Sequence, residues 1–453
     1  MYSPTRRTFL RQTACAALGT SGLLSTIFDL RKLSAATMVD PGDYKALVCL
    51  FLYGGNDANN LIVPSDASGY ASYAAARGNL ALALSSLLPL TLQNGDGRSF
   101  GFHPNLGELQ ALFNQGKLGL VSNVGTLVAP VTRAQYLAGG AAVPPQLFSH
   151  ADQSVQWQTS VPDQPPRTGW GGRAADLLQS LNTGSHVSLS ISIAGTNTFE
   201  VGNTVIPYQV SPDGSIGLTG FDGSANANVR LQAFRDLMNA PQQNLFAQAY
   251  ADTVTRSMAN NDLLTSALAN STPLQTVFPA TTLGKQLNMV ARLISARNSL
   301  SMRRQIFFCA VQGYDTHGDQ LTAQADLFAE LSQGLSAFYA ATAEMAVADQ
   351  VTSFTASDFG RTFPTNGDGS DHGWGSHQFV LGGAVRGGRL FGTFPTLAVN
   401  GPDDTGRGRW IPTTSVDEFS ATLASWFGVS ASDMTTVLPN IGRFANPNLG
   451  FFA

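Results

Sequence analysis

Short, nearly continuous apolar runs alternate along the chain with longer segments in which apolar residues recur at helical spacing. Four apolar runs stand out, at residues 45–53, 117–124, 304–313 and 351–357. Such runs are typical of strands that are buried on both faces of a parallel sheet. Helical spacing fills segments between and after them, for instance at residues 102–116, 321–338 and 416–427. This alternation predicts an α/β fold in which helices flank a mainly parallel central sheet.

Between residues 226 and 300 the pattern becomes helical, with breaks at Pro241, Pro273 and Pro279. This stretch contains no histidine and few other side chains suited to catalysis. We therefore expect an insertion that forms a helical side layer. Because no internal repeat is visible in the 453 residues, we expect a single domain at residues 37–453 that carries this insertion.

The first 36 residues have the features of an export signal. Arg6 and Arg7 are followed by Phe9 and Leu10, then by a weakly apolar stretch and by small residues that end at Ala36. This order matches a twin-arginine signal peptide, so we expect the twin-arginine export machinery to carry the folded protein to the periplasm or out of the cell. The apolar stretch is too short and too rich in Gly, Ser and Thr for a stable membrane span.

Composition narrows the functions further. Charged residues make up only 12% of the chain, and the formal net charge is −4. Since no basic cluster follows the signal, binding to nucleic acid through a basic surface is disfavoured. Beyond residue 36, Cys49 and Cys309 both lie in apolar strand-like runs. Buried free thiols are expected, with a disulfide between neighbouring strands as the alternative.

Acidic and imidazole side chains follow three of the apolar runs at the point where each predicted strand ends. The carboxyl ends of parallel strands meet at one edge of a sheet, so we expect these side chains to converge. The richest segment, residues 354–378, begins as a strand and continues as a Gly-rich loop with two of the six histidines. Imidazole nitrogens and carboxylate oxygens suit Zn²⁺, Mn²⁺ or a mixed pair of ions. The predicted ligands are Asp57, Asp315, His317, Asp358, His372 and His377.

Some of these ligands also have structural interpretations. Asp57 can accept a hydrogen bond from its own turn, and His317 can cap the helix that follows it. His372, with Asp371, can support a ligand from behind instead of binding an ion.

Two further residues are candidates for the chemistry or for local structure. Ser149 is placed to cap a helix that begins at the next residue. Arg361 lies close to Asp358 along the chain, so it can form an ion pair or clamp an anion.

The motifs that carry these residues resemble those of a known family. They include LVCLFLYGGNDANNLIVP at residues 47–64, SHADQ at 149–153, GYDTHG at 313–318, SDFGRT at 357–362 and DHGWGSH at 371–377. Over nearly the whole chain they resemble an uncharacterised exported bacterial family, domain of unknown function 1501. That family is similar to the alkaline phosphatase/sulfatase superfamily. The resemblance implies an α/β core, one or two divalent metal ions (Zn, Mn, Mg or Ca) and a nucleophile at a helix N-terminus.

The resemblance also implies roles for individual residues. Ser149 stands where the nucleophile is expected, flanked by His150 and Asp152, and the helix N-terminus would stabilise its alkoxide. The chain departs from the superfamily at Phe359, where a histidine is usual, and it lacks the Cys/Ser-x-Pro-x-Arg signature of formylglycine sulfatases. The implied metal ligands are Asp57 after the first strand, Asp315 with His317 in one site, Asp358 shared with the other, and His377 or His372 as the late histidine.

The expected function is therefore an exported, metal-dependent hydrolase of a phosphate or sulfate ester on a small molecule or a polymer. The ions would polarise the ester, Ser149 or a metal-bound hydroxide would attack, and Arg361 would hold the anion. The alternative, motivated by Phe359, is a non-catalytic periplasmic or cell-surface binding or assembly protein that retains the fold.

Overall fold

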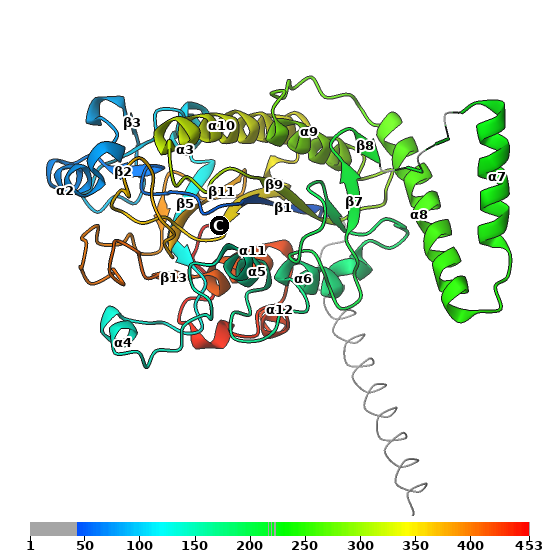
Figure 1. The fold of residues 1–453 in the computed structure, drawn as a ribbon. Helices are drawn as coiled ribbons and strands as arrows, with labels where there is room; N and C mark the ends of the chain where they lie inside the picture. Colours follow the sequence, from blue (N-terminus) through cyan, green and yellow to red (C-terminus); the bar gives the residue numbers. More distant parts are fainter. Residues whose placement is uncertain (1–42, 216, 219, 222, 453) are drawn as a thin grey trace, which may run out of the picture.

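A large mixed sheet forms the centre of the molecule (Figure 1). The computed structural model describes residues 43–215, 217–218, 220–221 and 223–452, so the predicted signal at residues 1–36 lies outside them. The ten strands of the sheet follow the order β12-β5-β11-β10-β1-β9-β6-β7-β8, with β13 paired to β5. Their bounds are β1 (Lys45–Leu52), β5 (Leu118–Gly125), β6 (Ser190–Ser192), β7 (Tyr208–Ser211), β8 (Gly214–Ser215), β9 (Arg304–Val311), β10 (Val351–Ser357), β11 (Ser376–Gly382), β12 (Leu390–Phe391) and β13 (Thr414–Ser415).

Helices cover both faces of this sheet. One face is covered by α3 (Gly107–Asn114), α9 (Thr282–Ser295) and α10 (Gln320–Glu344) (Figure 1). The opposite face is covered by α5 (His150–Thr159), α6 (Trp170–Leu178), α11 (Val416–Phe427) and α12 (Met434–Val437). The prediction of an α/β fold with helices on both sides of the sheet is confirmed.

The apolar character of β1 follows from burial on both of its faces. Leu47, Cys49 and Phe51 pack in the core below α11, whereas Val48 and Leu50 pack in the core below α9 and α10. Alternate residues of a strand point to opposite faces, so both sets must be apolar.

The same alternation explains why the two cysteines form no disulfide. Cys49 lies in one core, and Cys309 on the neighbouring strand β9 lies in the other. Both are free thiols, and the alternative of a disulfide between them is wrong because the two side chains face opposite sides of the sheet.

Antiparallel pairing occurs between β7 and β8 at one edge of the sheet and, nearer its centre, at β11. Strand β1 is parallel to both β10 and β9, and β6 is parallel to β9 and β7. In contrast, β11 runs antiparallel to β10 and to β5. The sheet is therefore mainly parallel in its centre, and the chain between β10 and β11 returns over the carboxyl ends of the parallel strands.

Smaller elements surround this core. A second sheet has the order β2-β4-β3, with β2 (Ile62–Pro64), β3 (Leu88–Pro89) and β4 (Phe100–Phe102). Two short helices, α2 (Ala67–Arg77) and α4 (Arg133–Leu137), lie in the loops around it and after β5. The 3-10 turns are η1 (Gly78–Leu80), η2 (Leu84–Ser86), η3 (Gln179–Leu181), η4 (Ala348–Gln350) and η5 (Ile441–Arg443).

The helical stretch expected at residues 226–300 consists of three helices with different surroundings. Helix α9 packs against the sheet and α10. Helices α7 (Ala225–Asn239) and α8 (Leu245–Ala269) form a hairpin that stands away from the sheet (Figure 1). Among the described residues, no helix is both long and apolar enough to cross a bilayer.

Candidate metal centre

The candidate site lies where three parallel strands end together. Leu52 at the end of β1 pairs with Ser357 of β10 and with Val311 of β9, so the three carboxyl ends are in register. Asp358 follows β10 directly, and Asp315 lies in the loop after β9. The convergence predicted for these strand ends therefore exists for both carboxylates.

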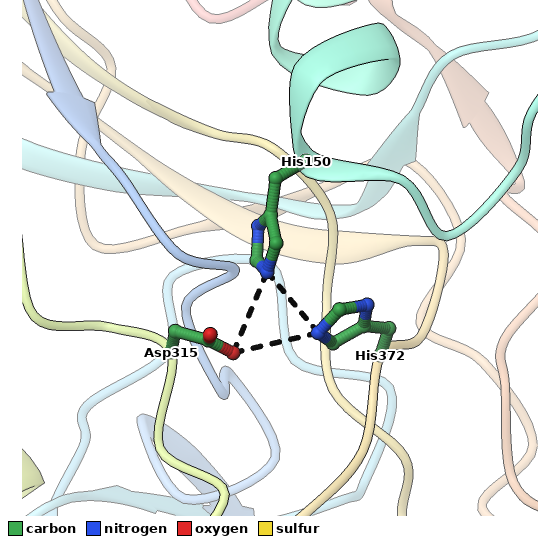
Figure 2. Close-up of side chains that lie close together, drawn as sticks. All are labelled: His150, Asp315 and His372. Atoms are coloured by element: carbon green, nitrogen blue, oxygen red, sulfur yellow. Dashed lines mark hydrogen bonds and ion pairs between the residues drawn. The ribbon is translucent and has the colours of Figure 1, made fainter.

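Two imidazoles meet the carboxylate of Asp315 at this edge (Figure 2). The Nε2 atom of His150 lies 3.5 Å from Oδ1 of Asp315, and Nε2 of His372 lies 3.4 Å from the same oxygen. The two Nε2 atoms are 3.1 Å apart. Potential donor atoms of these three residues all lie within 4.8 Å of one another, a spacing that fits one metal ion.

His317 brings a third imidazole to the same point. Its Nε2 atom lies 2.9 Å from Nε2 of His372 and 3.1 Å from Oδ1 of Asp315. The side chains of Asp315 and His317 are each 46% exposed, so a ligand in solution can reach the cluster. We call His150, Asp315, His317 and His372 the His/Asp cluster.

The rings of His150 and His372 are oriented from behind by hydrogen bonds to their other nitrogen. Nδ1 of His150 lies 2.6 Å from Oδ2 of Asp358, and Nδ1 of His372 lies 2.7 Å from the carbonyl oxygen of Phe148. Both partners are acceptors, so each Nδ1 carries a proton, and in the neutral form of each ring the lone pair of Nε2 points into the cluster. Lone pairs that face each other at about 3 Å repel unless a cation lies between them.

Local backbone conformations hold these acceptors in place. Phe148 has a positive φ of 71°, which is rare for a bulky residue and aims its carbonyl oxygen at His372. Gly54 has a φ of 117° and donates its N–H to Oδ2 of Asp358 at 3.0 Å. A Cβ atom on Gly54 would lie 2.3 Å from the backbone nitrogen of Asp315, so only glycine fits this approach of two loops.

The charges of the cluster are coupled. The hydrogen bond to Asp358 raises the pKa of His150, against the effect of partial burial. Burial lowers the pKa of His372, despite its bond to Phe148. Burial would raise the pKa of Asp315, but the hydrogen bond and charge of Arg361, with the nearby imidazoles, lower it on balance. Asp315 is therefore held as a carboxylate beside at least one neutral imidazole.

The structure does not support the anion clamp predicted for Arg361. Its side chain is fully buried and donates to Oδ1 of Asp315 at 2.7 Å, to the carbonyl of Gly54 at 3.1 Å and to the carbonyl of Ser370. These contacts leave it no face toward solvent, so Arg361 positions Asp315 and ties the loop after β10 to the loop after β1.

Asp57 is predicted as a ligand but lies outside the His/Asp cluster. Its Oδ2 accepts hydrogen bonds from Arg77 and Gln320, and its Oδ1 accepts from the backbone and side-chain nitrogens of Asn59 at 3.0 and 2.9 Å. Both side chains of the Arg77–Asp57 ion pair are 0% exposed. The carboxylate is fully used by a buried ion pair and its own turn, which contradicts the predicted ligand role.

His377 is also predicted as a ligand, and the structure separates it from the cluster too. It belongs to β11, is only 3% exposed, and stacks on Phe394 with ring centroids 4.7 Å apart. Its Nδ1 accepts the N–H of Asn123 at 3.1 Å. Burial lowers the pKa of His377 to about 3, so it is a neutral core residue.

Ser149 occupies the position before α5, as expected, but it does not cap the helix with its side chain. Its hydroxyl donates instead to Oδ2 of Asp152 at 2.6 Å. The next residue, His150, belongs to the cluster although the sequence indicated it only as a neighbour of Ser149.

Phe359 packs directly on the cluster. Its ring centroid lies 4.7 Å from that of His150 and 4.7 Å from that of His372. Contact with Phe359 thus holds the planes of both imidazole rings. One of these rings, His372, comes from the loop after β10. The other carboxylate oxygen of Asp358, Oδ1, is buried without a hydrogen-bond partner among the described residues.

The fold and the cluster together define an α/β protein with a histidine- and aspartate-rich centre at the carboxyl edge of its parallel strands. Residues 44–438 match the family described as Protein of unknown function (DUF1501), and the chain belongs to that family. No curated protein matches the chain.

The chain is also similar to several solved structures. The PsFucS1 sulfatase from Pseudoalteromonas sp. is 11% identical, with 89% of this chain and 72% of that chain covered and a TM-score of 0.36. The C-terminal periplasmic domain of EcEptC from Escherichia coli is 12% identical, with 90% of each chain covered and a TM-score of 0.33. A mutant of the alkaline phosphatase PafA is 12% identical, with 71% and 64% covered and a TM-score of 0.25. At these identities the likeness concerns the fold alone.

Proposed function

We propose that the protein is an exported, metal-dependent hydrolase of phosphate or sulfate esters. One observation carries the proposal: the Nε2 atoms of His150, His317 and His372 gather around one carboxylate oxygen of Asp315. Three imidazoles and a carboxylate are a ligand set suited to Zn²⁺ or a similar divalent ion. The partly buried hydrogen bond from His150 to Asp358 adds the outer support that such ligands require.

A bound divalent ion would supply Lewis-acid activation of the ester. The chain itself would orient and bind the substrate. Ser149 lies at the N-terminus of α5, directly before the cluster residue His150, and its hydroxyl donates a hydrogen bond to Oδ2 of Asp152 at 2.6 Å. Asp152 would therefore serve as the base that takes the proton of Ser149.

The anion-binding role falls to a different arginine from the one first expected. Arg407 is 71% exposed, and its Nη2 lies 3.5 Å from Oδ2 of Asp371. Asp371 in turn lies 3.5 Å from Nδ1 of His317. Arg407 is thus a solvent-accessible cation one carboxylate away from the cluster, where it would attract an anionic ester.

The test combines metal content with activity. Purified protein should contain about one divalent ion per chain by elemental analysis and should hydrolyse a generic phosphomonoester, phosphodiester or sulfate ester. The variants Asp315→Ala and His372→Ala should lose the ion and the activity. His186→Ala is the matched control, because His186 is exposed at the opposite end of the strands and should change neither.

A second function is favoured by Phe359, which covers one side of both imidazoles. In that case the chain binds the ion and uses it to hold an anionic ligand without turnover. Metal with no hydrolysis of any of the three ester classes would favour this binding function. A metal-free and inactive wild type would overturn the hydrolase proposal.

A further inference from the structure

The hairpin of α7 and α8 ends in a tip without charge. Residues 237–251 contain no Asp, Glu, Lys or Arg. The turn has its own hydrogen bonds: the N–H of Gln242 donates to Oε1 of Gln248 at 2.9 Å, and Asn244 caps α8 by accepting from the N–H groups of Phe246 and Ala247. The tip is therefore a defined structure and not a loose connection.

Apolar side chains at this tip face solvent. Leu237 is 58% exposed, Leu245 80%, Phe246 84% and Tyr250 64%. Scattered exposed apolar residues are ordinary on a protein surface, whereas four at the adjoining ends of α7 and α8 mark a site of interaction.

The tip also lies far from the core of the protein. In α8 the residues of the main core are Leu264, Ala267 and Leu268, close to the end of the helix. The first half of α8 and most of α7 extend beyond them, and Figure 1 shows the hairpin standing apart from the sheet and its covering helices. A ligand or surface can therefore approach the tip without meeting the rest of the molecule.

We infer that residues 237–250 form a lipid-binding element that inserts its apolar side chains into the surface of a bilayer. A stable contact with a second protein needs about 800 Å² on each partner, and four side chains supply less than that. A lipid surface needs no complementary shape, and a few Leu and Phe side chains on an ordered turn are enough to enter it.

The charges beside the tip specify the kind of lipid. The nearest charged residues are Arg235 and Asp236 before it and Asp252 and Arg256 after it. Both signs occur on each side, and Arg235 is already paired with Asp262 at 3.1 Å. Attraction to anionic headgroups needs a cluster of basic residues, so the partner is a zwitterionic or neutral membrane surface. This inference stands apart from the proposed hydrolase function.

Vesicle binding tests the inference directly. The full chain, and a chain that begins at Thr37 after the predicted signal, are mixed with phosphatidylcholine vesicles and sedimented. The second chain contains every described element, so it reports on the fold without the apolar stretch of the signal. We expect it to bind, and we expect the double variant Leu245→Ser, Phe246→Ser to bind at least tenfold more weakly. Val277→Ser, which alters an 87% exposed residue outside the tip, should bind like the wild type.

Four results separate the inference from its rivals. Binding should be unchanged between low and high salt, and hydrogen exchange of residues 237–250 should slow when vesicles are added. Binding only to vesicles with anionic lipid, with loss at high salt, would overturn the neutral-surface assignment. A dimer that the Leu245→Ser, Phe246→Ser change dissociates, with no vesicle binding, would show that the tip binds a second copy instead.

Discussion

Oδ2 of Asp358 lies 2.6 Å from Nδ1 of His150, on the side of the ring away from the His/Asp cluster. Asp358 thus orients His150 and does not itself reach the point where the Nε2 atoms meet. Asp358 is therefore proposed to support a metal ligand, whereas the sequence predicted that it binds the ion itself.

Asp358→Asn should weaken metal binding by about 10- to 100-fold, because the amide no longer fixes the proton on Nδ1 of His150. Competition with a chromophoric chelator measures the change in affinity. Asp368→Asn is the matched control, since Asp368 lies on the same loop and, among the described residues, its side chain accepts only the N–H of Asp319. Equal affinities for Asp358→Asn and wild type would remove Asp358 from the site.

Ser149→Ala should lower kcat by about 10³-fold or more if Ser149 is the nucleophile, while metal content stays the same. Ser154→Ala, a change on the same helix at an exposed hydroxyl that bonds to Ala151, should leave kcat unaltered. Full activity of Ser149→Ala would mean that water attacks the ester directly.

Arg407→Ala should raise KM by about tenfold with kcat changed by less than about twofold, because a rim cation binds the ground state and the transition state alike. Steady-state kinetics at two salt concentrations measures both constants. Arg98→Ala provides the comparison, as Arg98 is also exposed but pairs with Asp96 in a different loop. A fall in kcat with KM unchanged would contradict this role.

Asp57→Ala should destabilise the protein by about 3–5 kcal/mol, because it leaves the guanidinium of Arg77 buried without its partner. Metal affinity should not change. Denaturant unfolding gives the free energy, and the double variant Asp57→Ala, Arg77→Met should regain part of the loss. Loss of metal by a folded Asp57→Ala protein would restore Asp57 as a ligand.

His377→Asn should flatten the dependence of stability on pH. Burial lowers the pKa of His377 to about 3 from an unfolded value of about 6.5, so between these values the unfolded chain binds the extra proton. Stability therefore falls as pH falls, by about 1.4 kcal/mol for each pH unit from this one group. Asparagine keeps an acceptor for the N–H of Asn123 but does not titrate.

Unfolding free energies at pH 7.5, 6.5, 5.5 and 4.5 measure the two slopes. Burial also lowers the pKa of His103, to about 4, but this residue is present in both proteins and cancels in the difference. Parallel curves for wild type and His377→Asn would contradict the assignment of His377 as a neutral core residue.

The pattern of apolar runs predicted the central strands well, because the runs are short, rich in strand-forming residues and followed by turn residues. Strand ends likewise predicted the edge at which Asp315, His317 and His372 meet. What a strand end does not specify is the direction of the next side chain. Asp57 turns back into the core to meet Arg77, a partner 20 positions away that no local pattern relates to it.

His377 shows that the direction of a side chain is equally unspecified in a sequence that reads as a loop. Two histidines in one Gly-rich segment indicated a shared role, yet β11 begins at Ser376 and carries the second one into the core. His150 was missed for the opposite reason: the start of a helix explains a Ser-His-Asp sequence by itself, and only the packing of α5 against the strand ends brings the ring to Asp358.

The cluster joins parts of the chain that are distant in sequence, since His150 and His372 are 222 positions apart and His317 and His372 are 55 positions apart. An ion held by all of them would act as a cross-link, closing large loops and removing conformational freedom from the unfolded chain much as a disulfide does. Cys49 and Cys309 lie on opposite faces of the sheet and offer no such bond. Loading of the ion would then report that the distant halves of the chain have been assembled, and chelation would loosen the whole fold and not only the site.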